Sequence, residues 1–289
     1  MLYRISVAVI ALAVLPMMVA TTRALDESKY PDLRGEWRRV AVPSGRYQGV
    51  QYDPHKPAGP GQEAPLTPEY QAIFESNLAD QALGGQAGDP TYRCLSPGMP
   101  RVMAPYGEME VVVVPETTYI LIDHIHDSRR IYTDGRDFPA NMADNPQFTG
   151  YSIGRWVDEG GHGRYDTLIV ETRGMKGPRT FEMTGIPLHK DNQTIVRERI
   201  YLDKNDLNTL HDEITTIDNA LTRPWTVIKD YHRTQTNQPI WWNEAVCAEN
   251  NVHVMIGDEV YFLSADGQLM PSKRDQPPPD LKYFKQDRE

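Results

Sequence analysis

The sequence has 289 residues, of which 39% are hydrophobic and 24% are charged, an ordinary composition for a globular protein. Acidic residues outnumber basic ones by 40 to 30, so the formal net charge is −10 at neutral pH. An acidic surface repels phosphate groups, and this makes nucleic acid and anionic lipid poor candidates as partners.

The first 24 residues have the layout of a cleavable signal peptide. Arg4 supplies a positive charge, and Ile5 to Ala20 form an uncharged, largely apolar stretch. Thr22 and Ala24 offer small residues at the two positions that a signal peptidase reads. A membrane anchor is the alternative, but the stretch is short for a bilayer span and contains Pro16. We therefore expect a periplasmic or secreted protein, with no stable membrane anchor after cleavage.

One strand and one helix are expected among irregular stretches in residues 25–108. Pro31 to Trp37 lead into a first strand that ends near Val40, and residues 41–65 are rich in Pro, Gly and Gln. Thr67 is a suitable N-cap before a proline, which predicts an amphipathic helix over residues 68–83. We expect this helix to pack outside the sheet through apolar residues at helical spacing, namely Tyr70, Ile73, Phe74 and Leu78.

The two cysteines, Cys94 and Cys247, are far apart in the sequence. In an oxidising compartment, two such cysteines most simply form one disulfide. A catalytic thiol is the alternative, although neither cysteine lies in a recognisable nucleophile motif.

From Glu108 onwards the hydrophobic pattern changes to a period of two, which is typical of strands. We expect residues 109–263 to form one continuous antiparallel sheet, and residues 109–289 to hold a β-barrel core and a C-terminal tail, in one domain with residues 25–108. The run of hairpin signals, such as Asp134-Gly135, favours a closed meander over a Greek-key sandwich. Gly35-x-Trp37 is also found in lipocalin-like barrels, so the fold class predicted is mostly β: an antiparallel lipocalin-like barrel or a highly curved sheet, with one N-terminal amphipathic helix.

Several sequence pieces, in a specific order, resemble a large group of exported bacterial proteins of unsettled function. The matching pieces are Pro31-Asp32-Leu33-x-Gly35-x-Trp37, Cys94-Leu95-x-Pro97-Gly98-x-Pro100-Arg101, His126 with Arg129-Arg130-Ile131, Asp134-Gly135-Arg136, Gly150-x-Ser152-x-Gly154-Arg155-Trp156 and Thr222-Arg223-Pro224-Trp225. The resemblance covers most of the mature chain and implies an exported, β-rich fold. It implies no particular activity.

The segment Tyr119 to Tyr132 is the most suggestive place for chemistry. If it is one strand, alternation places His124, His126 and Arg130 on one face. An acid–base site and a structural hydrogen-bond network are both consistent with such a face. A third reading is a zinc-type metal at the two histidines, with a further ligand from His211, Glu213 or His253.

Carboxylates and aromatic residues supply further candidates. Glu171, Glu198 and Glu213 each fall inside an expected strand, where an inward carboxylate could act as a general acid or base and an outward one would form an ion pair. Aromatic side chains could line a ligand pocket or simply pack in the core; those on expected strands are Tyr119, Trp156 and Trp225.

Two functions follow from these observations. The first is an exported enzyme that acts on a small, partly apolar molecule by acid–base chemistry, as a lyase, isomerase, hydratase or hydrolase. Its catalytic residues would be His124, His126, Arg130, Glu198 and Glu213, with no cofactor expected. The second is a lipocalin-like binding or carrier protein without turnover.

Overall fold

The computed structural model of the chain describes residues 25–40, 64–123, 128–234, 242, 253–257, 259–264 and 266–279. The predicted signal peptide, His124, His126 and Cys247 lie outside the described residues, so what the sequence predicts for them stays a prediction.

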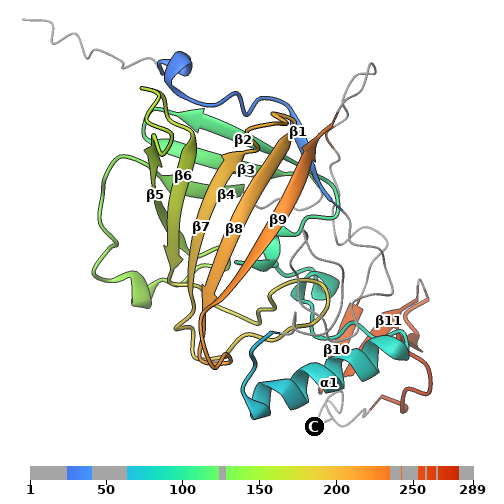
Figure 1. Ribbon diagram of the computed structural model, residues 1–289. Coiled ribbons are helices and arrows are strands. Elements are labelled where there is room, and N and C mark those ends of the chain that lie inside the picture. The colour runs from blue at the N-terminus through green and yellow to red at the C-terminus, as the bar shows by residue number, and fades with distance from the viewer. Residues whose placement is uncertain are drawn as a thin grey trace, which may run out of the picture.

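Nine strands close into a barrel in which most neighbours along the chain are also neighbours in space (Figure 1). They are β1 (Glu36–Arg39), β2 (Glu108–Val114), β3 (Thr117–Ile122), β4 (Ser128–Tyr132), β5 (Tyr151–Val157), β6 (Thr167–Arg173), β7 (Ile195–Leu202), β8 (Thr209–Ile217) and β9 (Trp225–Arg233). This architecture confirms the predicted fold class, a mostly β protein with a lipocalin-like barrel and one helix.

The barrel is closed by β1, which pairs with β2 on one side and with β9 on the other. The prediction that residues 109–263 form the whole sheet is therefore wrong at its beginning. It is also wrong at its end, because β10 (His253–Ile256), β11 (Glu259–Leu263) and β12 (Leu269–Pro271) form a separate three-stranded sheet. Since β1 already occupies the free edge of β9, the closed barrel offers later strands no edge to join.

One junction of the barrel is parallel. All neighbouring strands run antiparallel except β4 and β5, so the prediction of a fully antiparallel barrel is wrong there. A parallel pair requires the chain to cross back to the starting end of the first strand. Residues 133–150, which include the short 3-10 helix η4 (Met142–Asp144), make this crossing instead of the expected hairpin at Asp134-Gly135.

The helix α1 (Pro68–Ala82) begins as predicted, because the side chain of Thr67 accepts a hydrogen bond from the backbone of Tyr70. Tyr70 and Phe74 are buried, while Ile73 is 41% exposed and does not take part in the predicted packing face. α1 lies beside β10 and β11, at one end of the barrel (Figure 1). Within the described ranges, no helix is long and apolar enough to cross a membrane.

Two irregular segments close the barrel at the end near α1. The first connects β6 to β7 and contains Phe181 and Glu182. Phe181 packs on Trp225 with their ring centroids 4.4 Å apart, and Arg39 donates a 2.8 Å hydrogen bond to Glu182. The 3-10 helix η3 (Arg101–Met103) covers the same interior, since the hydroxyl of Tyr231 donates to the carbonyl of Met103.

The N-terminal segment covers part of the opposite end. Its 3-10 helix η1 (Glu27–Lys29) lies at the end of the barrel away from α1 (Figure 1). Tyr30 packs edge-on against Trp156, with 5.4 Å between ring centroids, and against Tyr165 at 5.1 Å. The backbone N–H of Tyr165 donates to the carbonyl of Lys29, which ties the segment to the β5–β6 loop.

Cys94 follows the 3-10 helix η2 (Pro90–Arg93), where it adopts a left-handed backbone conformation with φ of 55°. Because its expected partner Cys247 lies outside the described residues, the disulfide stays a prediction.

Candidate functional site

The segment expected to carry two histidines and an arginine is two strands, β3 and β4, which pair antiparallel. The chain turns between Asp123 and Ser128, and this turn changes which side chains face inward. Arg129 is buried in the barrel, whereas Arg130 is exposed on the outer wall with its guanidinium 5.2 Å from the ring centre of Tyr119. The prediction that Arg130 points into the barrel is therefore wrong, because it assumed unbroken alternation through the turn.

Two of the three candidate glutamates lie on the outer wall. Glu171 accepts hydrogen bonds from Arg173 and Arg197, and Glu213 accepts one from Arg199 at 2.8 Å. The interpretation of these two carboxylates as ion-pair partners of neighbouring strands is confirmed, and their inward placement is wrong.

The histidines proposed as further metal ligands are also separated. His211 is hydrogen-bonded on its two ring nitrogens by Asp230 and Asp203, at 2.7 and 3.2 Å, and His253 begins β10 in the separate sheet. Among the described residues, no group of three or more His, Cys, Asp or Glu side chains could hold a metal ion.

Glu198 does face the barrel interior, as expected. Its carboxylate forms a two-pronged ion pair with Arg129, and both side chains are essentially inaccessible to solvent. Arg129 also donates to Thr172 at 2.9 Å, and Thr172 bonds Ser152 at 2.7 Å. A carboxylate held this way is satisfied by its cation, so Glu198 is a structural group of the barrel wall.

A second interior group was not predicted. Asp212 on β8 and Lys229 on β9 lie directly opposite each other, and both are completely buried. Neither charged group has a hydrogen-bond partner among the described residues. Burial raises the pKa of Asp212 well above its ordinary value and lowers the pKa of Lys229 to about 7. The signal in the sequence was a single charge at an inward position, with Leu210 and Ile214 flanking Asp212.

The three aromatic residues predicted to contact a ligand lie in three different places. Trp225 is core, packed on Phe181, and Tyr119 lies on the outer wall. Trp156 is half-buried at the end of the barrel near η1, where its indole donates to Thr118 at 3.1 Å. Trp156 thus helps to seat the N-terminal segment.

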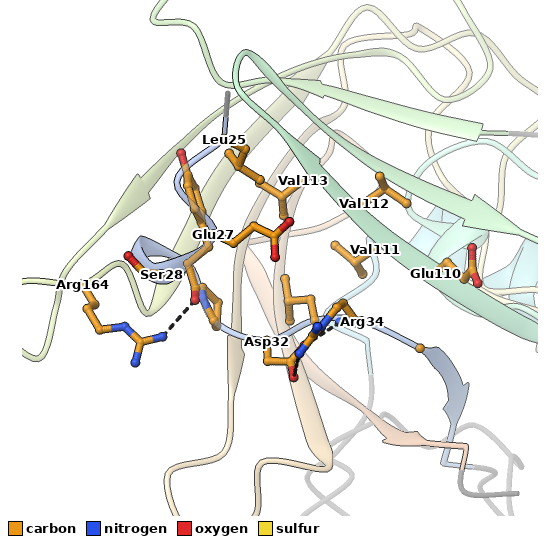
Figure 2. A pocket seen from close by; sticks show the side chains of 14 residues that line it. Leu25, Glu27, Ser28, Asp32, Arg34, Glu110, Val111, Val112, Val113 and Arg164 are labelled. Atoms are coloured by element: carbon orange, nitrogen blue, oxygen red, sulfur yellow. Dashed lines mark hydrogen bonds and ion pairs between the residues drawn. The ribbon is translucent and has the colours of Figure 1, made fainter. Parts of the chain in front are cut away.

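A cavity of about 540 Å³ lies between the N-terminal segment and β2. We call it the mouth cavity, because it is bounded by the segment that covers this end of the barrel. Its apolar lining includes Leu33, Val111 and Val113. Figure 2 shows Val111 and Val113 with charged side chains around them. Leu33 and Val111 belong to the buried core, so the apolar lining is continuous with the barrel interior.

The arginines at the mouth cavity are already engaged. Arg34 donates two hydrogen bonds to Asp32, at 2.8 and 2.9 Å, and these bonds lower the pKa of Asp32 to about 2. Arg164 donates to the carbonyl of Tyr30 at 3.1 Å. The carboxylates of Glu27 and Glu110 also line the cavity, and they form no hydrogen bond or ion pair with any residue that the structure describes.

A second cavity, of about 830 Å³, shares Pro31, Asp32 and Arg164 with the mouth cavity. It extends towards the β7–β8 loop, where Leu202 and Leu207 contribute to its lining. The segment around Pro31 therefore forms part of the wall of both cavities.

The chain was compared with protein-family models and with curated proteins. No protein-family model matches the chain, and no curated protein matches it. The resemblance to exported β-rich bacterial proteins consequently stays a prediction. The closed barrel itself is compatible with the binding of a small molecule.

Proposed function

We propose that the protein binds a small, partly apolar molecule in the mouth cavity. The observation that carries this proposal is a cavity of about 540 Å³ with an apolar floor and a charged rim at one end of a closed barrel. Its volume lies in the range of known small-molecule sites, roughly 300–1,000 Å³, and such sites combine apolar walls with a few polar groups.

Binding without turnover explains the described residues better than the predicted acid–base enzyme does. Arg130 and Glu213 lie on the outer wall, and Glu198 is occupied by Arg129. Within the described part of the chain, the proposed catalytic set is therefore not brought together. A carrier of apolar molecules needs only a lined cavity and an entrance.

The test is a titration of the neutral fluorophore N-phenyl-1-naphthylamine, whose emission increases in apolar surroundings. Val113→Glu places a charge on the apolar floor and is expected to weaken binding about tenfold or more, since burying an unpaired carboxylate is costly. Val114→Glu is the matched control, because Val114 is the next residue of β2, is more exposed and does not line the cavity. Equal binding by wild type and both folded variants would place the site elsewhere.

We also propose, from the sequence signals alone, that the protein acts after export and with a Cys94–Cys247 disulfide. Amino-terminal sequencing of the exported protein should begin at Leu25, the residue after the expected cleavage site. Thiol titration of the denatured, unreduced protein should find no free thiol. Two free thiols per chain would refute the disulfide.

A further inference from the structure

We propose that the mouth cavity selects organic cations, that is, amines or quaternary ammonium compounds with an apolar body. This inference rests on the proposed function and adds the chemical class of the ligand. It is drawn from the charges that remain open around the cavity after the internal pairs have been assigned.

The first step concerns the charges that are not open. Asp32 and Arg34 form a two-pronged pair, so their charges cancel at the rim. Arg164 donates one hydrogen bond to the carbonyl of Tyr30, which directs its guanidinium at the N-terminal segment in Figure 2 but leaves its positive charge in place. A ligand anion would have to compete with these existing bonds.

The second step concerns the charges that are open. Glu27 stands on η1 and Glu110 on β2, with Val111 and Val113 between them in Figure 2. Neither carboxylate forms a hydrogen bond or an ion pair within the described residues, and Glu27 acts on Arg34 through its charge alone. The charged residues lining the cavity are three acids and two arginines, which leaves it net negative before the rest of the acidic chain is considered.

The neighbouring strand shows the effect of this negative charge. Glu36 lies on β1, opposite Glu110 on β2. Burial raises the pKa of Glu36, and the negative charges of Glu108 and Glu110 raise it further, so Glu36 holds its proton more tightly beside them. Glu108 is paired with Arg38, which leaves Glu110 as the open charge of β2 at the cavity, and a net negative cavity attracts cations and repels anions.

The third step is the fit of an amphipathic cation. Its apolar body can cover the floor formed by Leu33, Val111 and Val113, while its ammonium group stays at the partly exposed rim. An ammonium that remains hydrated at the rim avoids most of the desolvation cost of a buried charge. Each carboxylate at the rim then favours the cation modestly, by about threefold to fivefold in affinity.

The experiment compares three ligands that share one aromatic ring system: 1-naphthylmethylamine, 1-naphthylmethanol and 1-naphthoate. Isothermal titration of the full chain should give the tightest binding for the amine, by about tenfold over the alcohol at low salt, and the weakest for the anion. The preference for the amine should shrink at high salt, because screening weakens exposed charges.

The double variant Glu27→Gln/Glu110→Gln should bind the amine and the alcohol about equally, with the affinity for the alcohol unchanged. Glu69→Gln/Glu116→Gln is the matched control, since both residues are exposed, neither lines the cavity, and the double variant changes the net charge equally. Equal binding of the amine and alcohol by wild type would overturn the inference while leaving the proposed function intact. No binding of any of the three would overturn both.

Discussion

The ion pair of Arg129 and Glu198 shows how a single residue can fix the interior of the barrel. Glu198→Gln removes the negative charge and leaves Arg129 buried without its ion-pair partner. We expect this change to lower the free energy of unfolding by about 3–5 kcal/mol. Glu171→Gln, on the outer face of the neighbouring strand β6, is the control and should cost about 1 kcal/mol or less. Chemical denaturation of the three proteins measures both values.

Lys229 makes the stability of the protein depend on pH. Its pKa of about 7 in the folded state is below its ordinary value of 10.5, so the unfolded chain binds the proton more tightly. Burying Lys229 therefore costs stability in full below about pH 7, and the cost falls as the pH rises towards the unfolded value, by up to about 1.4 kcal/mol per pH unit. The groups that act on it are Asp212 on the neighbouring strand, Arg39 on β1, and Glu182 and Arg101 from the covering segments.

The corresponding experiment compares wild type with Lys229→Met. The stability of the variant relative to wild type should be greatest near pH 7 and should decrease towards about pH 10. Asp212 acts in the same direction. The charge of Lys229 lowers the pKa of Asp212, so in the variant Asp212 ionises at a higher pH. Its ionisation then destabilises the folded variant as the pH rises. Urea denaturation across this pH range measures the difference. A difference that does not vary with pH would mean that Lys229 is not deprotonated in the folded state.

Among the structural elements, the parallel junction of β4 and β5 depends on Gly154. A Cβ atom at this position would lie 2.8 Å from Cγ2 of Ile131 and 3.1 Å from the carbonyl oxygen of Ile169. Gly154→Val should therefore destabilise the protein by about 1–3 kcal/mol through overpacking. Arg155→Val is the control, because Arg155 is the next residue of β5 and is exposed. If the Gly154→Val and Arg155→Val proteins have the same melting temperature, this packing is contradicted.

Element boundaries could largely be predicted from the sequence, because period-two patterns and turn residues are local signals. The helix predicted over residues 68–83 begins at Pro68 as predicted and ends one residue earlier, at Ala82. The break between β3 and β4 was not predicted, because Asp123, Asp127 and Ser128 are the residue types there that favour turns and no Gly, Pro or Asn accompanies them. This break reversed the predicted faces of Arg129 and Arg130, so Arg130 does not face the barrel interior.

For the whole molecule, the features that could not be predicted from the sequence are the ones that depend on closure of the barrel. The pairing of β1 with β9 joins residues nearly 200 positions apart, and no local pattern specifies it. The mouth cavity depends on the same long-range arrangement, because the N-terminal segment reaches β2 only when β1 closes the barrel. From the sequence, Leu33 was therefore predicted only to precede the first strand and Val111 only to lie in the sheet, and neither was predicted to line a cavity.

The most direct test of the central claim is a map of amide chemical-shift changes on addition of 1-naphthylmethylamine to the isotope-labelled protein. If the mouth cavity binds the ligand, saturable changes should be concentrated in residues 27–35 and 110–113, with little change around α1 and the sheet of β10 to β12. Saturable changes concentrated at that distant end, or no saturable change at all, would contradict the account.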